Sequence, residues 1–328
     1  MSSRLSLAAQ SGLFALPVAG RVCVYAPNAE TDLSLFDKEQ TDLIVSFYPD
    51  ATQFAAAGWT VVQKPEGPYA AAVVILPRSK TYAKALLADA NTQTTGQIVV
   101  DGGKTDGIDS LLKACKSLCD VSPAFSKAHG KTFVVAPGAD LGQWAEPEPP
   151  TGKIDGFVTR PGVFSAEKID AGSAALVAEL PKLLGAHVID LGAGWGFLSA
   201  SILTHPEVQE LHLVEADARA LDCARRNIDD PRAQFHWADA RQYQPKALAD
   251  CVITNPPFHT GRKGDPDLGK AFIAAAAKLL KPSGHLLIVA NRHLPYETTL
   301  QELFKTGQEL DGTRGFKVLH ARNPRRLR

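Results

Sequence analysis

The chain has 328 residues, of which 45% are hydrophobic and 21% are charged. This length predicts two domains, the apolar content excludes a disordered chain, and no run of about 18 apolar residues suggests a membrane-spanning helix. Lys and Arg number 35, as do Asp and Glu, and this neutral balance argues against a protein that coats nucleic acid with a wholly basic surface.

The cysteines indicate a reducing compartment. Five are scattered along the chain, and an odd number without regular spacing argues against a disulfide framework. Cys115 and Cys119 have no second pair of ligands, so we expect no metal site. The apolar stretch 13–16 follows polar residues and precedes a strand-like segment, which predicts the end of a helix and not a signal peptide. We therefore expect a cytoplasmic protein.

Short apolar runs alternate with helical segments in the first half of the chain. The run 73–76 is apolar throughout, which is typical of a parallel strand covered on both faces. The sequence thus predicts an α/β fold. The predicted strands of this half are 21–25, 43–48, 59–63, 72–76, 97–100 and 132–135.

A proline-rich segment divides the chain nearly in half. Residues 147–153 contain three prolines and a glycine, which cannot continue a helix or a central strand. We expect domains at 1–146 and 156–328, joined by a linker at 147–155. The predicted strands of the second half are 186–191, 210–215, 233–237, 249–254, 284–290 and 316–321.

The two halves share a pattern that indicates two copies of one α/β domain. In each, a strand and a turn lead into a helix, and a Phe-x-Val strand follows, at Phe133 and at Phe316. Any two parallel α/β domains would share some of this alternation of strands, turns and helices. Comparing the strand order of the two sheets would test the predicted duplication.

A glycine-rich loop follows the first strand of the second half. In Val188-Ile-Asp-Leu-Gly-Ala-Gly-Trp-Gly196, three glycines occupy alternate positions before a helical segment. Glycines permit a tight turn and let a ligand lie against the backbone. The carboxyl end of a strand is where open α/β sheets bind ligands. The spacing differs from the dinucleotide fingerprint, and the lysine of a phosphate-binding loop is absent.

Acidic residues end the next two strands. Glu215 follows Leu211-His-Leu-Val and is placed to accept hydrogen bonds from both ribose hydroxyls of a nucleoside, and Asp239 is placed to meet an adenine amino group. An ordinary strand–turn–helix with capping carboxylates is the alternative. Taken with the glycine loop, the two acids favour a nucleoside ligand.

This pattern resembles the class I S-adenosylmethionine-dependent methyltransferases over most of residues 156–328. The resemblance implies two tandem Rossmann-like domains, with a mainly parallel seven-stranded sheet in the second, and S-adenosylmethionine as cofactor. It implies a set of cofactor-binding residues: Asp190, Gly192, Ala193, Gly194, Gly196, Glu215, Ala216, Asp239, Ala240 and Asn255.

A rigid motif follows strand 249–254. Asn255-Pro-Pro-Phe-His259 contains two prolines, which fix the backbone and hold the preceding residues extended. The Asn255 side-chain carbonyl and the Pro256 backbone carbonyl can accept the N–H bonds of a planar amine, and Phe258 can stack on a base. An activated methyl donor needs alignment more than a strong base. A proline-rich turn without chemistry is the alternative.

Asn-Pro-Pro-(Phe/Tyr) is typical of methyltransferases acting on adenine N6, guanine N2 or protein glutamine. The extension to His259, the segments 161–165 and 169–173, and the tandem domains together resemble the ribosomal RNA small-subunit guanine-N2 methyltransferases of the C type and their large-subunit relatives. In that family the Pro-Gly-Val-Phe-Ser segment covers the cofactor.

This resemblance implies transfer of a methyl group to the exocyclic N2 of a guanine in ribosomal RNA, with 16S RNA as the expected substrate. The catalytic residues would be Asn255, Pro256 and Phe258. The first domain would be a degenerate copy that binds no cofactor, because 26–29 lacks a glycine loop and 76–79 replaces the Asn-Pro-Pro-Phe motif.

Basic and polar residues near the motif and in the C-terminal tail predict contact with RNA. The alternative for the tail is a solvated edge strand. We expect substrate contacts from Pro257, His259, Arg262, Lys263, Arg292 and His293.

The expected partner is ribosomal RNA or the small ribosomal subunit, without membrane or metal, and the expected state is a monomer. Three other functions stay open: an adenine-N6 methyltransferase, a glutamine methyltransferase and a non-catalytic RNA-binding assembly factor. The intact Asn255 motif argues against the last, because binding alone does not need acceptor geometry.

Overall fold

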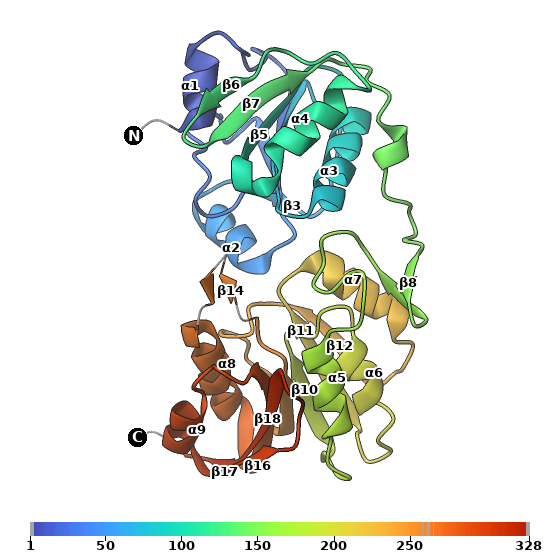
Figure 1. Ribbon diagram of the computed structural model, residues 1–328, viewed down its shortest axis with the longest axis vertical. Helices are drawn as coiled ribbons and strands as arrows, with labels where there is room; N and C mark the ends of the chain where they lie inside the picture. Colours follow the sequence, from blue (N-terminus) through green and yellow to red (C-terminus); the bar gives the residue numbers. More distant parts are fainter. Residues whose placement is uncertain (1–2, 258, 261–262, 265, 326–328) are drawn as a thin grey trace. The chain divides into compact units, whose positions relative to one another are not determined.

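The structure, a computed structural model, describes residues 3–257, 259–260, 263–264 and 266–325. It divides into two compact units, Met1–Pro150 and Thr151–Arg328. Each unit is built around its own seven-stranded sheet (Figure 1). The division falls inside the proline-rich segment.

The first unit is an α/β domain whose sheet has the order β3-β2-β1-β4-β5-β7-β6. The strands from β3 to β5 run parallel, and β7 is antiparallel to both β5 and β6. Its strands are β1 Val22–Tyr25, β2 Thr41–Ile44, β3 Thr60–Val62, β4 Ala71–Ile75, β5 Ile98–Gly103, β6 Phe125–Lys127 and β7 Gly130–Val135. Its helices are α1 Arg4–Gln10, α2 Tyr48–Ala56, α3 Lys80–Gln93, α4 Ile108–Lys116 and the 3₁₀ turns η1 Lys104–Asp106 and η2 Gly142–Trp144.

One predicted strand of this unit was wrong at its end, and one strand was not predicted. The apolar run 43–48 is not one strand, because β2 ends at Ile44 and Phe47 is the N-cap of α2, with Pro49 in the first helical turn, where proline is tolerated. The sequence also missed β6, a three-residue edge strand whose residues are partly or fully exposed.

Helices α3 and α4 pack on one face of the sheet through an apolar cluster.

The second unit has the sheet order β12-β11-β10-β13-β16-β18-β17. Its strands are β8 Gly152–Ile154, β9 Phe157–Thr159, β10 His187–Leu191, β11 Glu210–Glu215, β12 Ala233–Trp237, β13 Ala249–Thr254, β14 His259–Thr260, β15 Lys263–Gly264, β16 Leu280–Asn291, β17 Phe304–Leu310 and β18 Phe316–Pro324. Its helices are α5 Ala171–Ala178, α6 Phe197–Ile202, α7 Ala218–Asn227, α8 Pro266–Leu279 and α9 Glu297–Leu303.

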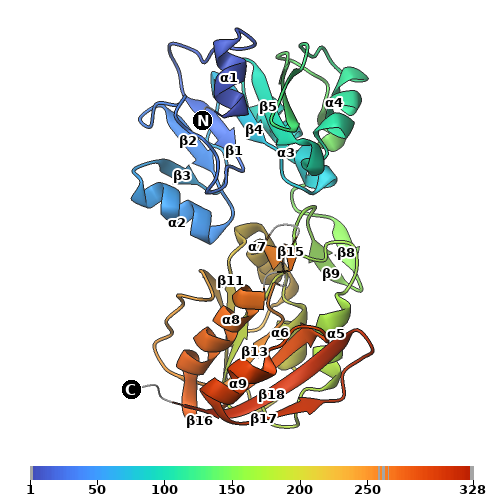
Figure 2. The ribbon, with the colours of Figure 1, turned by 60° about the vertical axis from the view of Figure 1, so that its left-hand side comes forward.

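The two large sheets have the same strand order. This is seen when the seven sheet strands of each unit are numbered from one to seven along the chain. Both sheets run third, second, first, fourth, fifth, seventh, sixth. In the second unit β18 is antiparallel to both β16 and β17, and the three lie side by side in Figure 2. The predicted tandem α/β fold, with a mainly parallel seven-stranded second sheet, is confirmed.

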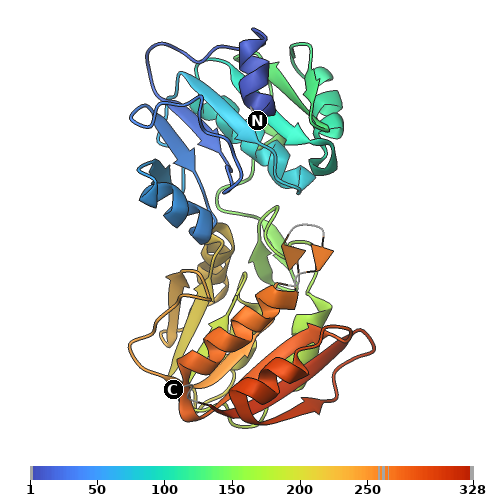
Figure 3. The same ribbon diagram turned by 90° about the vertical axis from the view of Figure 1, so that its left-hand side faces the viewer.

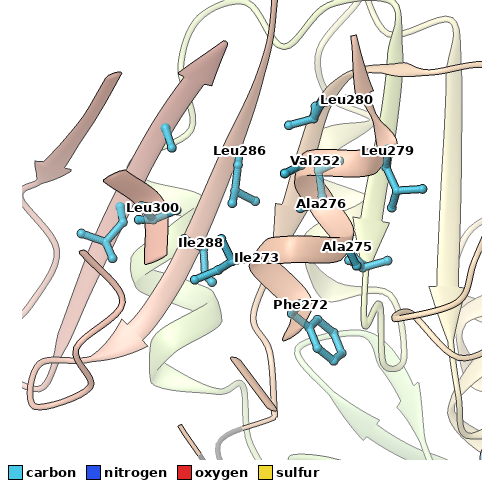
Figure 4. Close-up of a cluster of buried hydrophobic side chains, with 14 of the residues drawn as sticks. Val252, Phe272, Ile273, Ala275, Ala276, Leu279, Leu280, Leu286, Ile288 and Leu300 are labelled. Atoms are coloured by element: carbon cyan, nitrogen blue, oxygen red, sulfur yellow. The ribbon is translucent and has the colours of Figure 1, made fainter. Parts of the chain in front are cut away.

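Helices cover both faces of the second sheet. Alternate strand residues point to opposite faces, as the pleat requires: Val252 and Leu286 pack beneath α8 and α9, whereas Cys251 and Leu287 pack against α5, α6 and α7. Figure 3 shows α8 in orange and α9 in red before the sheet, and Figure 4 shows Phe272 and Ile273 of α8 in this cluster. With both faces covered, the carboxyl edge of the parallel strands is the place for a ligand.

Edge elements of this unit were missed by the sequence. Five of the seven residues of β17 are exposed, so the strand carries no apolar alternation, and β14–β15 is a hairpin of two residues a side. None of the helices among the described residues combines the length and apolar character that a membrane crossing needs.

Candidate active site

The loop after β10 is held open by backbone conformations that favour glycine. Gly192, Gly194 and Gly196 have φ of 84°, 57° and 93°. A Cβ at Gly196 would lie 2.9 Å from Cδ1 of Ile228, so this glycine lets α6 approach the end of α7 closely. A Cβ at Gly194 would meet nothing within 4 Å. Open space therefore lies beside Gly194, in the middle of the loop.

Glu215 ends β11 and turns toward this loop. Its Oε2 accepts the backbone N–H of Gly194 at 2.8 Å, and its Oε1 accepts that of Asp217 at 2.8 Å. Burial raises the pKa of the Glu215 carboxyl above its ordinary value. Each carboxylate oxygen keeps a further lone pair, so the group can take two more hydrogen bonds beside the glycine loop.

Asp190, one strand position before the end of β10, is completely buried. The Ser199 hydroxyl donates to its Oδ2 at 2.6 Å, while its Oδ1 has no hydrogen-bond partner among the described residues. Burial, with the nearby Glu215 charge, raises the pKa of Asp190 to about 7. Because buried polar atoms are nearly always paired, an orphaned carboxylate oxygen suits a site that a cationic ligand completes.

The remaining predicted cofactor residues follow the ends of β10, β11 and β12, which are neighbouring strands of the sheet. Asp239 is buried and paired with the Arg241 guanidinium at 2.7 Å, and although burial opposes it, this pairing lowers the pKa of Asp239. The Ala216 carbonyl accepts from the Trp237 indole at 2.8 Å. Ala193 and Ala240 are buried in the core. A contact between Asp239 and an adenine stays a prediction.

Asn255, at the end of β13, has an oriented side-chain amide. Its nitrogen donates to Asp170 Oδ2 and to Ser173 Oγ, both at 2.8 Å. Its Oδ1 is buried and has no partner within the described part of the chain. Thr254 ties the end of β13 to that of β10, since its hydroxyl donates to the Leu191 carbonyl at 2.6 Å. The amide thus presents an unused acceptor at the edge of the sheet.

Sequence reasoning did not assign Asp170 and Ser173 to the site. Both belong to the segment 169–173, and an Asp three residues before Ser173 is a helix N-cap signal: Asp170 caps α5 and accepts the Ser173 N–H at 2.8 Å. That local signal does not predict a contact with Asn255, which lies more than 80 residues away along the chain.

The segment 161–165 contacts the glycine loop through its backbone. The Trp195 indole donates to the Phe164 carbonyl at 2.9 Å. Trp195 itself is buried against Phe157 and Phe197, so it belongs to the core, while the Phe164 side chain is 59% exposed.

The predicted substrate residues are distributed around the carboxyl edge. Phe258 and Arg262 lie outside the described residues, as do the side chains of His259 and Lys263, whose backbones form β14 and β15. Pro257 is exposed, and so are Arg292 and His293, which directly follow β16. The Arg292 guanidinium pairs with Glu309 at 2.8 Å and donates to the Thr313 carbonyl at 2.7 Å. Contact of these residues with a substrate stays a prediction.

In the described ranges no group of three or more His, Cys, Asp and Glu is arranged to hold a metal ion.

Comparison with known proteins finds one family profile that matches most of the second unit. The profile of the methyltransferase small domain matches residues 155–320. The ribosomal RNA small subunit methyltransferase C of Hahella chejuensis is 32% identical over 67% of this chain and 67% of its own length. That of Stutzerimonas stutzeri is 31% identical over 79% and 81%, and the ribosomal RNA large subunit methyltransferase G of Shewanella amazonensis is 31% identical over 75% and 67%.

A solved structure has the same two-domain fold. The 16S rRNA N2 methyltransferase of T. thermophilus, in complex with AdoMet and guanosine, superimposes with a TM-score of 0.77. The match covers 94% of this chain and 90% of that chain at 24% sequence identity.

Proposed function

Because the chain belongs to the methyltransferase small domain family, together with the ribosomal RNA small subunit methyltransferases C, we propose that it methylates the exocyclic N2 of a guanine in ribosomal RNA, with 16S RNA as substrate. The methyl donor is S-adenosylmethionine. One observation carries the proposal: the buried Oδ1 of Asn255 has no partner among the described residues and is aimed by two hydrogen bonds on the amide nitrogen.

The residues around the glycine loop fit this cofactor, which supplies an electrophilic methyl group on a positively charged sulfur. The open space at Gly194 lets a ligand approach the backbone. Glu215 has lone pairs left for the ribose hydroxyls. The orphaned oxygen of Asp190 puts negative potential at the base of the loop, where a cationic ligand is stabilised.

Asn255 and Pro256 act on the amine. The lone pair of an exocyclic nitrogen is delocalised into the ring, so the amine is a weak nucleophile. Hydrogen bonds from its two N–H groups to Asn255 Oδ1 and to the Pro256 backbone carbonyl would hold it in the geometry for attack. Alignment of this kind supplies roughly 7–11 kcal/mol of a barrier. The proton leaves after transfer, so a strong base is not needed.

The target guanine must leave its stack to reach Asn255, at a cost of roughly a few kcal/mol. We propose that Phe258 stacks on the extruded base, and that Pro257, His259, Arg262, Lys263, Arg292 and His293 contact the RNA.

The first unit would be a scaffold or RNA-docking module that binds no cofactor. Two features support this: the buried Leu76 follows β4, where the second unit has Asn255, and Val45 and Ser46 follow β2 without a carboxylate like Glu215. The protein would bind its ribosomal RNA substrate either as free RNA or within the small ribosomal subunit.

The test measures transfer of labelled methyl from S-adenosylmethionine to ribosomal RNA and to small subunits, followed by identification of the methylated nucleoside by mass spectrometry. We expect N2-methylguanosine from the wild type. Asn255→Ala should lower the rate roughly 100-fold or more. The matched control Asn28→Ala, which removes an exposed amide of the first unit, should keep the wild-type rate.

Each of the open alternatives gives its own result. Methyl on adenine N6 or on a glutamine would replace the substrate assignment. RNA binding by a wild-type protein that transfers no methyl would favour the assembly factor and refute the enzyme. Cofactor affinity of Asn255→Ala, measured by calorimetry, separates a loss in the transfer step from a loss of binding.

A further inference from the structure

We propose that Asp170 and Ser173 are positioning residues for methyl transfer, which hold the Asn255 amide with its carbonyl oxygen toward the substrate amine. This inference rests on the proposed function. Neither residue needs to touch the substrate, because each acts through the amide nitrogen of Asn255.

The need for positioning comes from the near symmetry of the asparagine side chain. A half-turn about its last torsion exchanges an acceptor for a donor, and the two forms have almost the same shape. A donor facing the amine would repel its N–H groups. The Asp170 carboxylate removes this ambiguity, because the reversed amide would direct its oxygen at Oδ2, which has no hydrogen to donate, while Ser173 Oγ accepts a second hydrogen bond from the amide nitrogen.

Asp170 is itself held in place by the helix that it caps. The same Oδ2 that accepts from Asn255 also accepts the Ser173 N–H at 2.8 Å. Helix α5 packs on the sheet through Ala175 and Leu176. A Cβ on Gly172 would lie 3.1 Å from the Phe316 ring of β18, so glycine at this position lets the first turn of α5 pack closely against β18. The acceptor is therefore fixed to the same sheet that carries Asn255.

Asp170 contributes charge as well as geometry. A hydrogen bond from the amide nitrogen to a carboxylate is stronger than one to a neutral oxygen. Such a bond polarises the amide and makes the distant carbonyl oxygen a better acceptor. Ser173 lacks the charge and contributes a second hydrogen bond to the amide nitrogen.

Two substitutions of Asp170 separate helix capping from positioning. Asp170→Asn and Asp170→Ser both retain an N-cap side chain. Asparagine keeps an oxygen at the distance of Oδ2, whereas the serine hydroxyl is one bond shorter and does not reach Asn255. Ser173→Ala removes the second acceptor. Ser79→Ala, which removes the side-chain cap of α3 in the first unit, is the control for the loss of a helix cap.

The measurements are kcat and KM for methyl transfer to RNA, the Kd for S-adenosylmethionine, and Tm. We expect Asp170→Ser to lower kcat about 10- to 100-fold, with KM, Kd and Tm close to wild type. The kcat of Asp170→Asn should exceed that of Asp170→Ser by about tenfold. Ser173→Ala should lower kcat several-fold, and Ser79→Ala should lower only Tm.

Other results overturn the proposal. Equal kcat for Asp170→Ser and Asp170→Asn would show that reach to Asn255 does not matter. If kcat, cofactor affinity and Tm all fall together in Asp170→Ser, the role of Asp170 is only to cap helix α5. If the wild type methylates a nitrogen other than guanine N2, the substrate assignment fails, but the same comparison still tests how Asn255 is positioned.

Discussion

The buried Asp190 carboxylate predicts a pH-dependent instability of the cofactor-free protein. Its pKa, ordinarily 3.8, is raised to about 7 by burial and by the neighbouring Glu215. The folded state therefore binds this proton more tightly than the unfolded state, and stability falls as the pH rises from about 4 to about 7. A shift of about three units corresponds to about 4 kcal/mol once the group is ionised in both states.

Asp190→Asn removes the charge and keeps the shape. The new amide oxygen can still accept from Ser199, which donates to Asp190 Oδ2 in the wild type. At pH 8 we expect the variant to gain up to about 4 kcal/mol in free energy of unfolding, and this gain should be about 3 kcal/mol smaller at pH 5. Its affinity for S-adenosylmethionine should fall at least tenfold, because an amide N–H replaces the orphaned acceptor.

The assay is urea unfolding without cofactor at pH 5 and pH 8. Replacing Trp59 and Trp144 by Phe in both proteins leaves Trp195 and Trp237 as reporters of the second unit. Calorimetry at pH 8 gives the cofactor affinity. A variant no more stable than wild type at pH 8, or a gain that is the same at the two pH values, would refute the reasoning.

Substitutions of two glycines separate cofactor binding from folding, and a third substitution tests the pH dependence of stability. Gly194→Ala should cost about 1–2 kcal/mol of stability for its φ of 57°, but should lower cofactor affinity at least tenfold by filling open space. Gly196→Ala should cost more stability, since its Cβ also meets Ile228, and the urea midpoints of the two variants compare them directly. Burial and the adjacent His285 lower the pKa of His320 to about 4, so stability is lost as the pH falls from about 6.5 to about 4. His320→Gln should abolish about 3 kcal/mol of that loss, and unchanged acid sensitivity would contradict this.

The parallel core of each sheet was predictable because its strands are covered on both faces. Segments such as 71–75 and 249–254 are apolar over most of their length, and turns separate them from helices. The edges were not predictable for the opposite reason. Strand β17 exposes most of its side chains, so hydrogen bonds to β18 and not burial define it, and a sequence pattern does not record backbone pairing.

The local backbone geometry of the candidate site was predictable where it lies within one chain segment. The glycine loop and the Asn255 motif are such segments, because glycine and proline restrict the backbone locally. The contacts from Asp170 and Ser173 to Asn255 were not predictable, because they join helix α5 to strand β13. Similarly, only the fold shows that the Arg292 guanidinium is bonded within the β17–β18 region.

The two orphaned oxygens support the proposal that a ligand binds at this edge of the second sheet. Asp190 pairs with Ile253 across β10 and β13, two residues before Asn255, so both oxygens arise at the ends of adjacent strands. Each leaves a buried acceptor without a partner among the described residues, at a cost of about 1–3 kcal/mol. Asp190→Asn, which removes a buried charge, should therefore stabilise the free protein while weakening its binding of the cofactor. That opposition between stability and activity is what distinguishes a binding edge from a strand end that only caps a helix.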